Sequence, residues 1–237
     1  MINQLVLADD VDNSAAIAAN NGQTLDIQIG RTITCTGYFN TICLPFSLPT
    51  LDGTPLEGAE LWAFKYAKVE NEELLFRIVE ASSIEAGKPY FIQFAAGDPI
   101  ENPLFKNVTI SATAGQHIGD ASVAQLCGIL QPETFAPGDK TKLFLYNENA
   151  LYWWNGDHNS QLKSFRAYFY VNTTSGANYS PIRHGMIARI IKEEQTATGV
   201  DNVQGDNVQC IKMIENDQIV IIKNGVKYNV QGQVISK

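Results

Sequence analysis

The sequence lacks any apolar run approaching the ~20 residues that a membrane-spanning helix needs. It also begins without the basic and then apolar segment of a secretory leader, because Met1 is followed by Ile2, Asn3 and Gln4. The first absence argues against a membrane span. The second leaves two interpretations, a cytosolic protein or a secreted protein from which a leader has been removed.

Positive charge is sparse. The chain has 17 Lys and Arg against 25 Asp and Glu, which gives a formal net charge of -8. No cluster of Lys and Arg reaches the density of a surface that binds phosphate backbones. We therefore expect no nucleic-acid binding, and no oligomeric state follows from the composition.

Cysteine is also scarce, and the four cysteines contain no Cys-x-x-Cys pair. A structural zinc site usually needs such a pair, so zinc is not expected. Cys35 and Cys43 flank Gly37 and could form a disulfide across a hairpin. The alternative is that Cys35, Cys43, Cys127 and Cys210 are mostly small buried hydrophobic residues.

The motifs of common enzyme classes are absent. The sequence contains no Gly-x-Ser-x-Gly, no His-Glu-x-x-His, no Walker phosphate loop and no Gly-x-Gly-x-x-Gly. His117, His158 and His184 are far apart in the sequence, and each alone is typical of a surface or loop histidine. We expect a protein that is not an enzyme, with a hydrolase that uses a carboxylate pair as the third hypothesis.

What the chain does contain is short β-type segments. The segment 37–48 (GYFNTICLPFSL) is rich in β-branched and aromatic residues. Pro45 lacks a backbone donor, so the strand must lie at a sheet edge or end there. We interpret residues 31–48 as two strands joined by a tight turn at Gly37. Further strands are expected at 2–7, 24–29, 60–66, 73–79, 88–94, 108–112, 123–130, 143–146, 151–154, 165–171 and 186–191.

Few helical signals interrupt these strands. Ala15 to Ala19 predicts one short helix near the N-terminus, which Asp12 or Ser14 would cap. Strands this short and this evenly punctuated predict an all-β fold, an antiparallel β-sandwich of the Ig-like or jelly-roll-like kind.

A change of composition near residue 198 predicts two domains. Residues 1–197 would form the sandwich, and residues 198–237 a polar linker with a small C-terminal β extension of three strands. Asn224 and Gly225 carry the signal of a two-residue hairpin in that extension.

Several short motifs together resemble a repeated β domain of secreted and surface proteins of the Bacteroidetes. They are 31–34 (RTIT), 40–46 (NTICLPF), 84–90 (IEAGKPY), 107–110 (NVTI) and 166–169 (RAYF). The resemblance covers residues 5–200, and residues 214–233 are similar to a type-nine secretion sorting domain. It implies a periplasmic to extracellular location, with the leader removed. Phe39 stands where many relatives have Trp, so no role of that Trp carries over, and the resemblance supplies no catalytic residues.

The best ligand candidate is the aromatic segment 152–158 (YWWNGDH). Trp153 or Trp154, if exposed, could stack on a sugar, with Asp157 and His158 as polar contacts. The alternative places one Trp in the core and its neighbour at a sheet edge.

A second candidate is an interaction face formed by Arg166, Tyr168 and Tyr170, which alternate along one strand. Its alternative is ordinary cross-strand pairing.

The acidic segment near the N-terminus offers the one cofactor hypothesis. Asp9, Asp10, Asp12 and Asn13 could bind calcium, although an acidic solvated turn explains them as well.

Taken together, the motifs and the resemblance predict a non-catalytic structural or adhesion module at the cell surface, whose partner is a surface glycan or protein. The alternative function is that of a carbohydrate-binding module.

Overall fold

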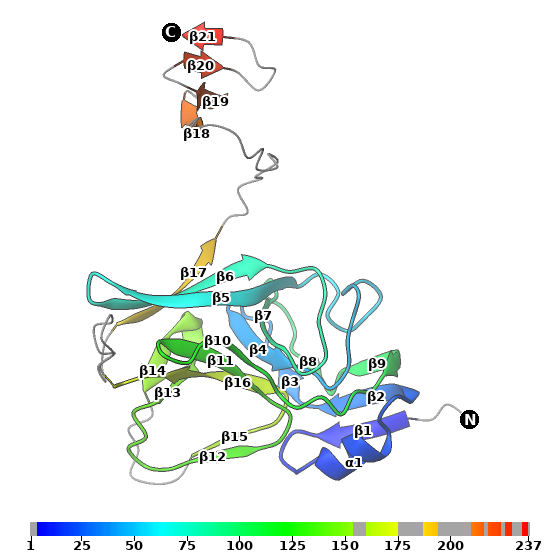
Figure 1. Cartoon of the computed structure of the whole chain (residues 1–237). Coiled ribbons are helices and arrows are strands. Elements are labelled where there is room, and N and C mark those ends of the chain that lie inside the picture. The colour runs from blue at the N-terminus through cyan, green and yellow to red at the C-terminus, as the bar shows by residue number, and fades with distance from the viewer. Residues whose placement is uncertain are drawn as a thin grey trace. The chain divides into compact units, whose positions relative to one another are not determined.

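The computed structural model describes residues 4–153, 160–174 and 187–193, together with the strands 210–215, 218–223, 226–228 and 234–236. The chain forms two compact units, Met1–Gln195 and Thr196–Lys237. Figure 1 shows the elements of the first unit, which is all-β apart from one short α-helix and one turn of 3-10 helix.

Two five-stranded sheets form the centre of the first unit. The strands of one sheet, in spatial order, are β17 (Ala188–Glu193), β6 (Glu73–Glu80), β5 (Glu60–Glu70), β7 (Pro89–Gln93) and β4 (Phe39–Cys43). Those of the other are β10 (His117–Asp120), β11 (Ala124–Ile129), β16 (Arg166–Val171), β13 (Lys142–Leu145) and β14 (Leu151–Trp153).

These two sheets pack face to face around an aromatic core. Phe169 on β16 lies against Phe76 on β6, with ring centroids 3.9 Å apart, and against Phe91 on β7 at 5.8 Å. All three side chains are fully buried. The predicted β-sandwich is confirmed, and burying this apolar surface is its main stabilising contribution.

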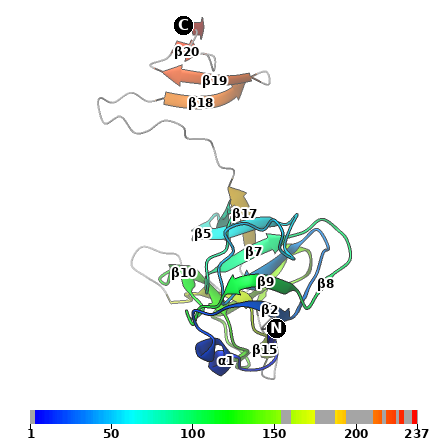
Figure 2. The same cartoon turned by 90° about the vertical axis from the view of Figure 1, so that its right-hand side faces the viewer.

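A further layer covers the other face of the first sheet at its β4–β7 end. It contains β1 (Gln4–Ala8), β2 (Thr24–Gly30) and β9 (Leu104–Thr109), and α1 (Ser14–Ala19) connects β1 to β2. Figures 1 and 2 both show β2 beside β9. Successive side chains of β7 serve the two cores, because Tyr90 and Ile92 face this layer while Phe91 faces the sandwich.

A two-stranded ribbon covers the outer face of the second sheet. It consists of β12 (Glu133–Phe135) and β15 (Ser160–Leu162), and Phe135 packs on Phe144 and Tyr168. Another two-stranded pair joins β3 (Thr32–Ile33) to β8 (Ile100–Glu101). The 3-10 turn η1 (Asn147–Asn149) connects β13 to β14.

The structure corrects the prediction for residues 31–48. β3 pairs with β8 and β4 pairs with β7, so the two predicted strands do not form a hairpin with each other. Gly37 does have the positive φ expected, 79°. The sequence pattern located the strands, but long-range partners decided the pairing.

Two other local predictions are also corrected. The N-cap of α1 is Asn13, whereas Asp12 accepts hydrogen bonds from the amide and hydroxyl of Ser14. Cys35, Cys43 and Cys127 are free thiols, so no disulfide joins Cys35 to Cys43. Asn71 and Glu72 form the β5–β6 turn, with φ of 50° and 63°.

Among the strand pairs of the described residues, most are antiparallel and two are parallel. β1 pairs with β2 in parallel across the helix connection, and β17 runs parallel to β6 at the edge of its sheet. No helix in the part of the chain that the structure describes has the length and apolarity that crossing a bilayer requires.

The second unit is an antiparallel sheet with four strands, where the sequence predicts three. They are β18 (Cys210–Glu215), β19 (Gln218–Lys223), β20 (Val226–Tyr228) and β21 (Val234–Ser236). Lys223 pairs with Val226, as expected for a hairpin through Asn224 and Gly225, two residues that lie outside the described ones.

Candidate functional site

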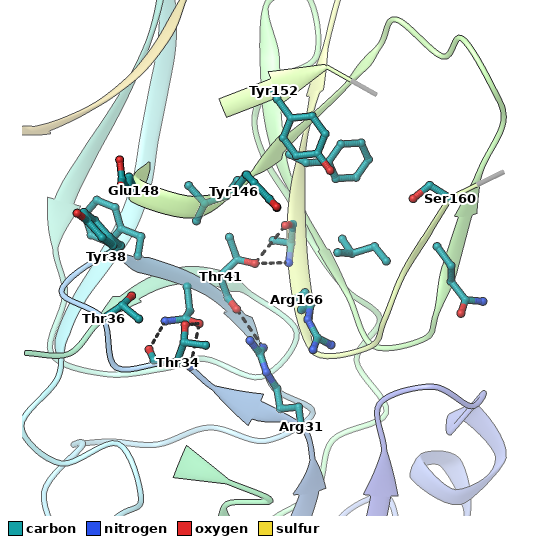
Figure 3. A pocket seen from close by; sticks show the side chains of 17 residues that line it. Arg31, Thr34, Thr36, Tyr38, Thr41, Tyr146, Glu148, Tyr152, Ser160 and Arg166 are labelled. Carbon is teal, nitrogen blue, oxygen red and sulfur yellow. Dashed lines mark hydrogen bonds between the residues drawn. The ribbon is translucent and has the colours of Figure 1, made fainter. Parts of the chain in front are cut away.

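A pocket of about 560 Å³ opens on one side of the first unit. It lies between the loop before β4, the β13–β14 hairpin, strand β15 and the start of β16 (Figure 3). Several of its lining side chains are tyrosines that remain partly exposed: Tyr38 at 39%, Tyr146 at 61% and Tyr152 at 39%. It is therefore an aromatic, water-accessible cavity.

The loop before β4 is held in one conformation. The side chain of Asn40 donates to the carbonyl oxygen of Thr34 at 2.8 Å and accepts from its hydroxyl at 3.0 Å. The backbone carbonyl of Gly37 accepts a hydrogen bond from the side chain of Gln93, and the backbone amide of Gly37 donates to the carbonyl of Phe94 at 3.1 Å. These bonds fix the wall that presents Tyr38.

The opposite wall is the tip of the β13–β14 hairpin. The amide of Tyr146 donates to the carbonyl of Ala150 at 2.8 Å, and the Tyr146 and Tyr152 rings meet edge to face at 5.4 Å. The side-chain oxygen of Asn149 accepts from the amide of Phe39 at 2.6 Å, which ties this wall to the first one. Partial burial, with a smaller contribution from Tyr146, raises the pKa of the Tyr152 phenol.

The floor of the pocket is where β4 meets β16. Thr41 bonds the backbone of Ala167, and Nη1 of Arg31 donates to the carbonyls of Thr41, at 3.0 Å, and of Phe165 (Figure 3). Arg31 is only 5% exposed. Burial, followed by the nearby charge of Arg166, lowers the pKa of Arg31 to about 9, while Asp9 opposes that shift. Arg31 therefore remains charged at neutral pH.

The two predicted tryptophans do not both belong to the described site. Trp153 is 8% exposed and packs in the sandwich core, so the hypothesis that Trp153 or Trp154 is exposed now depends on Trp154. Strand alternation explains this result, because Tyr152 and Trp153 point to opposite faces of β14. Trp154, Asp157 and His158 lie outside the described residues.

The predicted interaction face separates into two parts. Tyr168 is 5% exposed, because the β12–β15 ribbon covers it, and its hydroxyl donates to Glu133 at 3.0 Å. Tyr170 packs beside it, half-buried. Tyr168 is therefore not available to a partner, whereas Arg166 lines the pocket.

The predicted calcium ligands have other partners. Asp9 forms ion pairs with Lys163 and Arg166, and the side chain of Asn13 donates to the carbonyls of Ala8 and Val11. Asp12 accepts from Ser14, and Asp10 is exposed. Among the described residues, no group of three or more His, Cys, Asp or Glu side chains is placed to hold a metal ion.

The described lining offers one carboxylate, that of Glu148. Glycoside hydrolysis usually uses two carboxyl groups on opposite sides of the scissile bond, so this described lining does not supply the pair. His117 is exposed on β10 and does not line the pocket, and His158 and His184 lie outside the described residues.

Sequence reasoning missed three residues of the site, Tyr38, Tyr146 and Arg31. Tyr38 follows the turn glycine and Tyr146 precedes the polar segment 147–149, so both are aromatic residues at loop positions. Aromatic residues in loops are a signal for recognition. Nothing local in the sequence marks Arg31, because its role depends on carbonyls far along the chain.

The chain matches no family model, no curated protein and no solved structure.

Proposed function

We propose that this protein is a non-catalytic, secreted or cell-surface adhesion module that binds a glycan in the pocket between β4 and the β13–β14 hairpin. The observation that carries the proposal is the set of three partly exposed tyrosines, Tyr38, Tyr146 and Tyr152, on walls joined by hydrogen bonds. Flat aromatic faces stack on the apolar faces of sugars, and rigid walls lower the entropy lost on binding.

Polar groups of the same walls would give the pocket its selectivity. Thr36, Ser160 and Gln161 line it and can hydrogen-bond sugar hydroxyls. Residues 154–159 lie in the sequence between β14 and β15, which both line the pocket, so Trp154 adjoins the site along the chain. A site of this kind suits reversible attachment, because it needs no reacting group.

A glycan array followed by calorimetric titration tests this proposal. We expect the wild type to bind at least one sugar class and Tyr152→Ala to bind about tenfold more weakly, the equivalent of roughly 1.4 kcal/mol. Tyr66→Ala is the matched control, because Tyr66 is 37% exposed on β5 and does not line the pocket. Trp154→Ala tests the contribution of Trp154 in the same assay. If the wild type binds no sugar, the glycan proposal fails and a purely structural module takes its place.

Secretion is part of the same proposal. Its support is the resemblance of residues 5–200 to surface β domains and of residues 214–233 to a sorting segment. A fractionation experiment compares the full chain with a variant that lacks residues 196–237, both fused behind the same secretory leader, in a bacterium with type-nine secretion. The proposal predicts that only the full chain reaches the outer surface, and equal export of both would contradict it.

A further inference from the structure

Two guanidinium groups lie at the floor of the pocket. Arg31 comes from the segment between β2 and β3, and Arg166 begins β16 (Figure 3). Nη1 of Arg31 donates to two carbonyl groups, while its buried Nε has no hydrogen-bond partner among the described residues. The positive charge of Arg31 is thus nearly buried, and the charge of Arg166 acts on it.

Among the described residues around Arg166, positive groups outnumber negative ones. The two oxygens of Asp9 contact Arg166 at 2.9 Å and Lys163 at 3.2 Å. Asp9 is the one described carboxylate that pairs with these two cations, and its charge also acts on Arg31. Glu148 also lines the pocket, but Figure 3 shows it away from Arg166. The described residues therefore make this end of the pocket positive in a chain whose formal net charge is -8.

Arg166 has donors left for a ligand. A guanidinium carries five N–H groups. In Arg166, Nη1 donates to the carbonyl of Ser164 at 2.9 Å and Nη2 donates to Asp9. Its side chain is 21% exposed, so a bound molecule can contact it. A partly buried guanidinium forms strong, directional hydrogen bonds with a carboxylate, and low local polarity strengthens them.

We propose that the glycan of the proposed function is acidic and that its carboxylate binds Arg166 at the floor of the pocket, with Arg31 as a second positive charge nearby. This inference rests on the proposed glycan-binding function. The tyrosines contact the sugar ring, and the guanidinium pair selects sugars that carry a carboxylate. Uronic acids and sialic acids are two classes of sugar with this chemistry.

Calorimetric titration with matched sugars tests the inference. One pair is an oligogalacturonate and its methyl ester, and the other is sialyllactose and its methyl ester. We expect the acidic member of at least one pair to bind about tenfold or more tightly than its neutral partner. We also expect this preference to weaken as sodium chloride is raised, because salt screens charge. The pair that shows the preference identifies the sugar class.

Two variants assign the preference to Arg166. Arg166→Gln should lower the ratio of acidic to neutral affinity about tenfold, whereas Arg189→Gln should leave that ratio unchanged. Arg189 is a matched control because it forms an ion pair with Glu73 on β6 and does not line the pocket. If Arg166→Gln does not fold, as judged by circular dichroism, the comparison of acid with ester in the wild type still decides whether the pocket prefers an acidic sugar.

The outcomes separate the two proposals. Binding of acidic and neutral sugars with equal affinity overturns this inference and leaves the glycan-binding function intact. A preference for the acid that persists in Arg166→Gln overturns the assignment to Arg166. Absence of binding to every sugar overturns both the inference and the proposed function.

Discussion

The hydroxyl of Thr41 donates to the carbonyl oxygen of Ala167 at 3.2 Å and accepts from the amide of the same residue at 2.9 Å. Thr41 lies on β4 in one sheet of the sandwich, and Ala167 lies on β16 in the other. One buried side chain thus satisfies both backbone groups of a residue 126 positions away. Since these strands also form the floor of the pocket, this contact joins the fold to the site.

Replacing Thr41 with Val should destabilise the protein by about 1–3 kcal/mol, because the amide and carbonyl of Ala167 would remain buried without partners. Thr41→Ser keeps the hydroxyl and should cost less. Urea denaturation followed by tryptophan fluorescence measures both free energies of unfolding. Equal stability of Thr41→Val and the wild type would mean that water replaces the hydroxyl.

A substitution at Leu44, the residue directly after β4, tests the apolar core on that side of the sheet. It is 1% exposed and belongs to the cluster between the β1–β2–β9 layer and the first five-stranded sheet. Leu44→Ala should lower the free energy of unfolding by ~2–5 kcal/mol, through lost apolar burial and the cavity left behind. Val6→Ala is the control, because Val6 is 59% exposed, and it should change stability by less than about 0.5 kcal/mol.

The regularity of strand alternation explains why the sandwich could be predicted from the sequence. Along β16, Ala167, Phe169 and Val171 face the sandwich core while Tyr168 and Tyr170 face the ribbon, as a period of two requires. The pattern could not show that the second face is also covered. Tyr168 looked available because the residues that bury it, such as Phe135, come from a short ribbon that the sequence did not predict.

The site was less accessible to sequence reasoning for a related reason. A motif search finds residues that are close in the chain, but the pocket combines Tyr38 with Tyr152, and Arg31 with Arg166. The contact between Arg31 and Phe165 spans 134 residues, and only the packing of β4 against β16 brings it about. Tyr152, in contrast, belongs to the aromatic segment that the sequence did single out.

The buried thiols should resist alkylation in the folded protein. Burial raises the pKa of Cys43 to about 12 and that of Cys127 to about 11. Because the thiolate is the reactive species, iodoacetamide at pH 8 should label neither residue until the protein is unfolded in guanidinium. Peptide mass spectrometry measures the labelling.

The same shifts make stability fall as pH rises. In the unfolded chain these thiols ionise near the ordinary cysteine pKa of 9.0, whereas in the folded protein they stay protonated at that pH. The stability that the protonated thiols contribute is therefore fully present below pH 9.0. It is lost as pH increases towards about 12 for Cys43 and about 11 for Cys127. Rapid labelling of Cys43 at pH 8 in the native protein would contradict its burial.

The carboxylate of Glu193 should make the stability of the edge strand β17 depend on pH. Its carboxylate accepts from Lys65 at 2.6 Å and from Tyr66 at 2.9 Å, and hydrogen bonding by Lys65, then Tyr66, lowers its pKa. The stabilising effect of these bonds is present above the ordinary Glu pKa and is lost as pH falls through the lowered value. An NMR titration should show that Lys65→Met raises the Glu193 pKa, whereas Lys106→Met on β9 leaves it unchanged. A pKa unaffected by Lys65→Met would mean that the pair does not persist in solution.

Removing residues 196–237 should leave the first unit folded. The apolar clusters of the described residues all lie between Leu5 and Ile190, and β17 still pairs with β6 in this truncated chain. A chain that ends at residue 186 is the contrast, because it loses β17, its ladder with β6 and the packing of Ile190 on the sandwich core.

Calorimetry should show a single cooperative transition at a nearly unchanged melting temperature for the first truncation and a lower one for the second. Unfolding of the first truncation would mean that the four-stranded C-terminal sheet is required for the folding of the sandwich and that the division at Thr196 is wrong. Equal melting of both chains would mean instead that β17 contributes little, and that the sheet can end at β6 with its edge exposed to water.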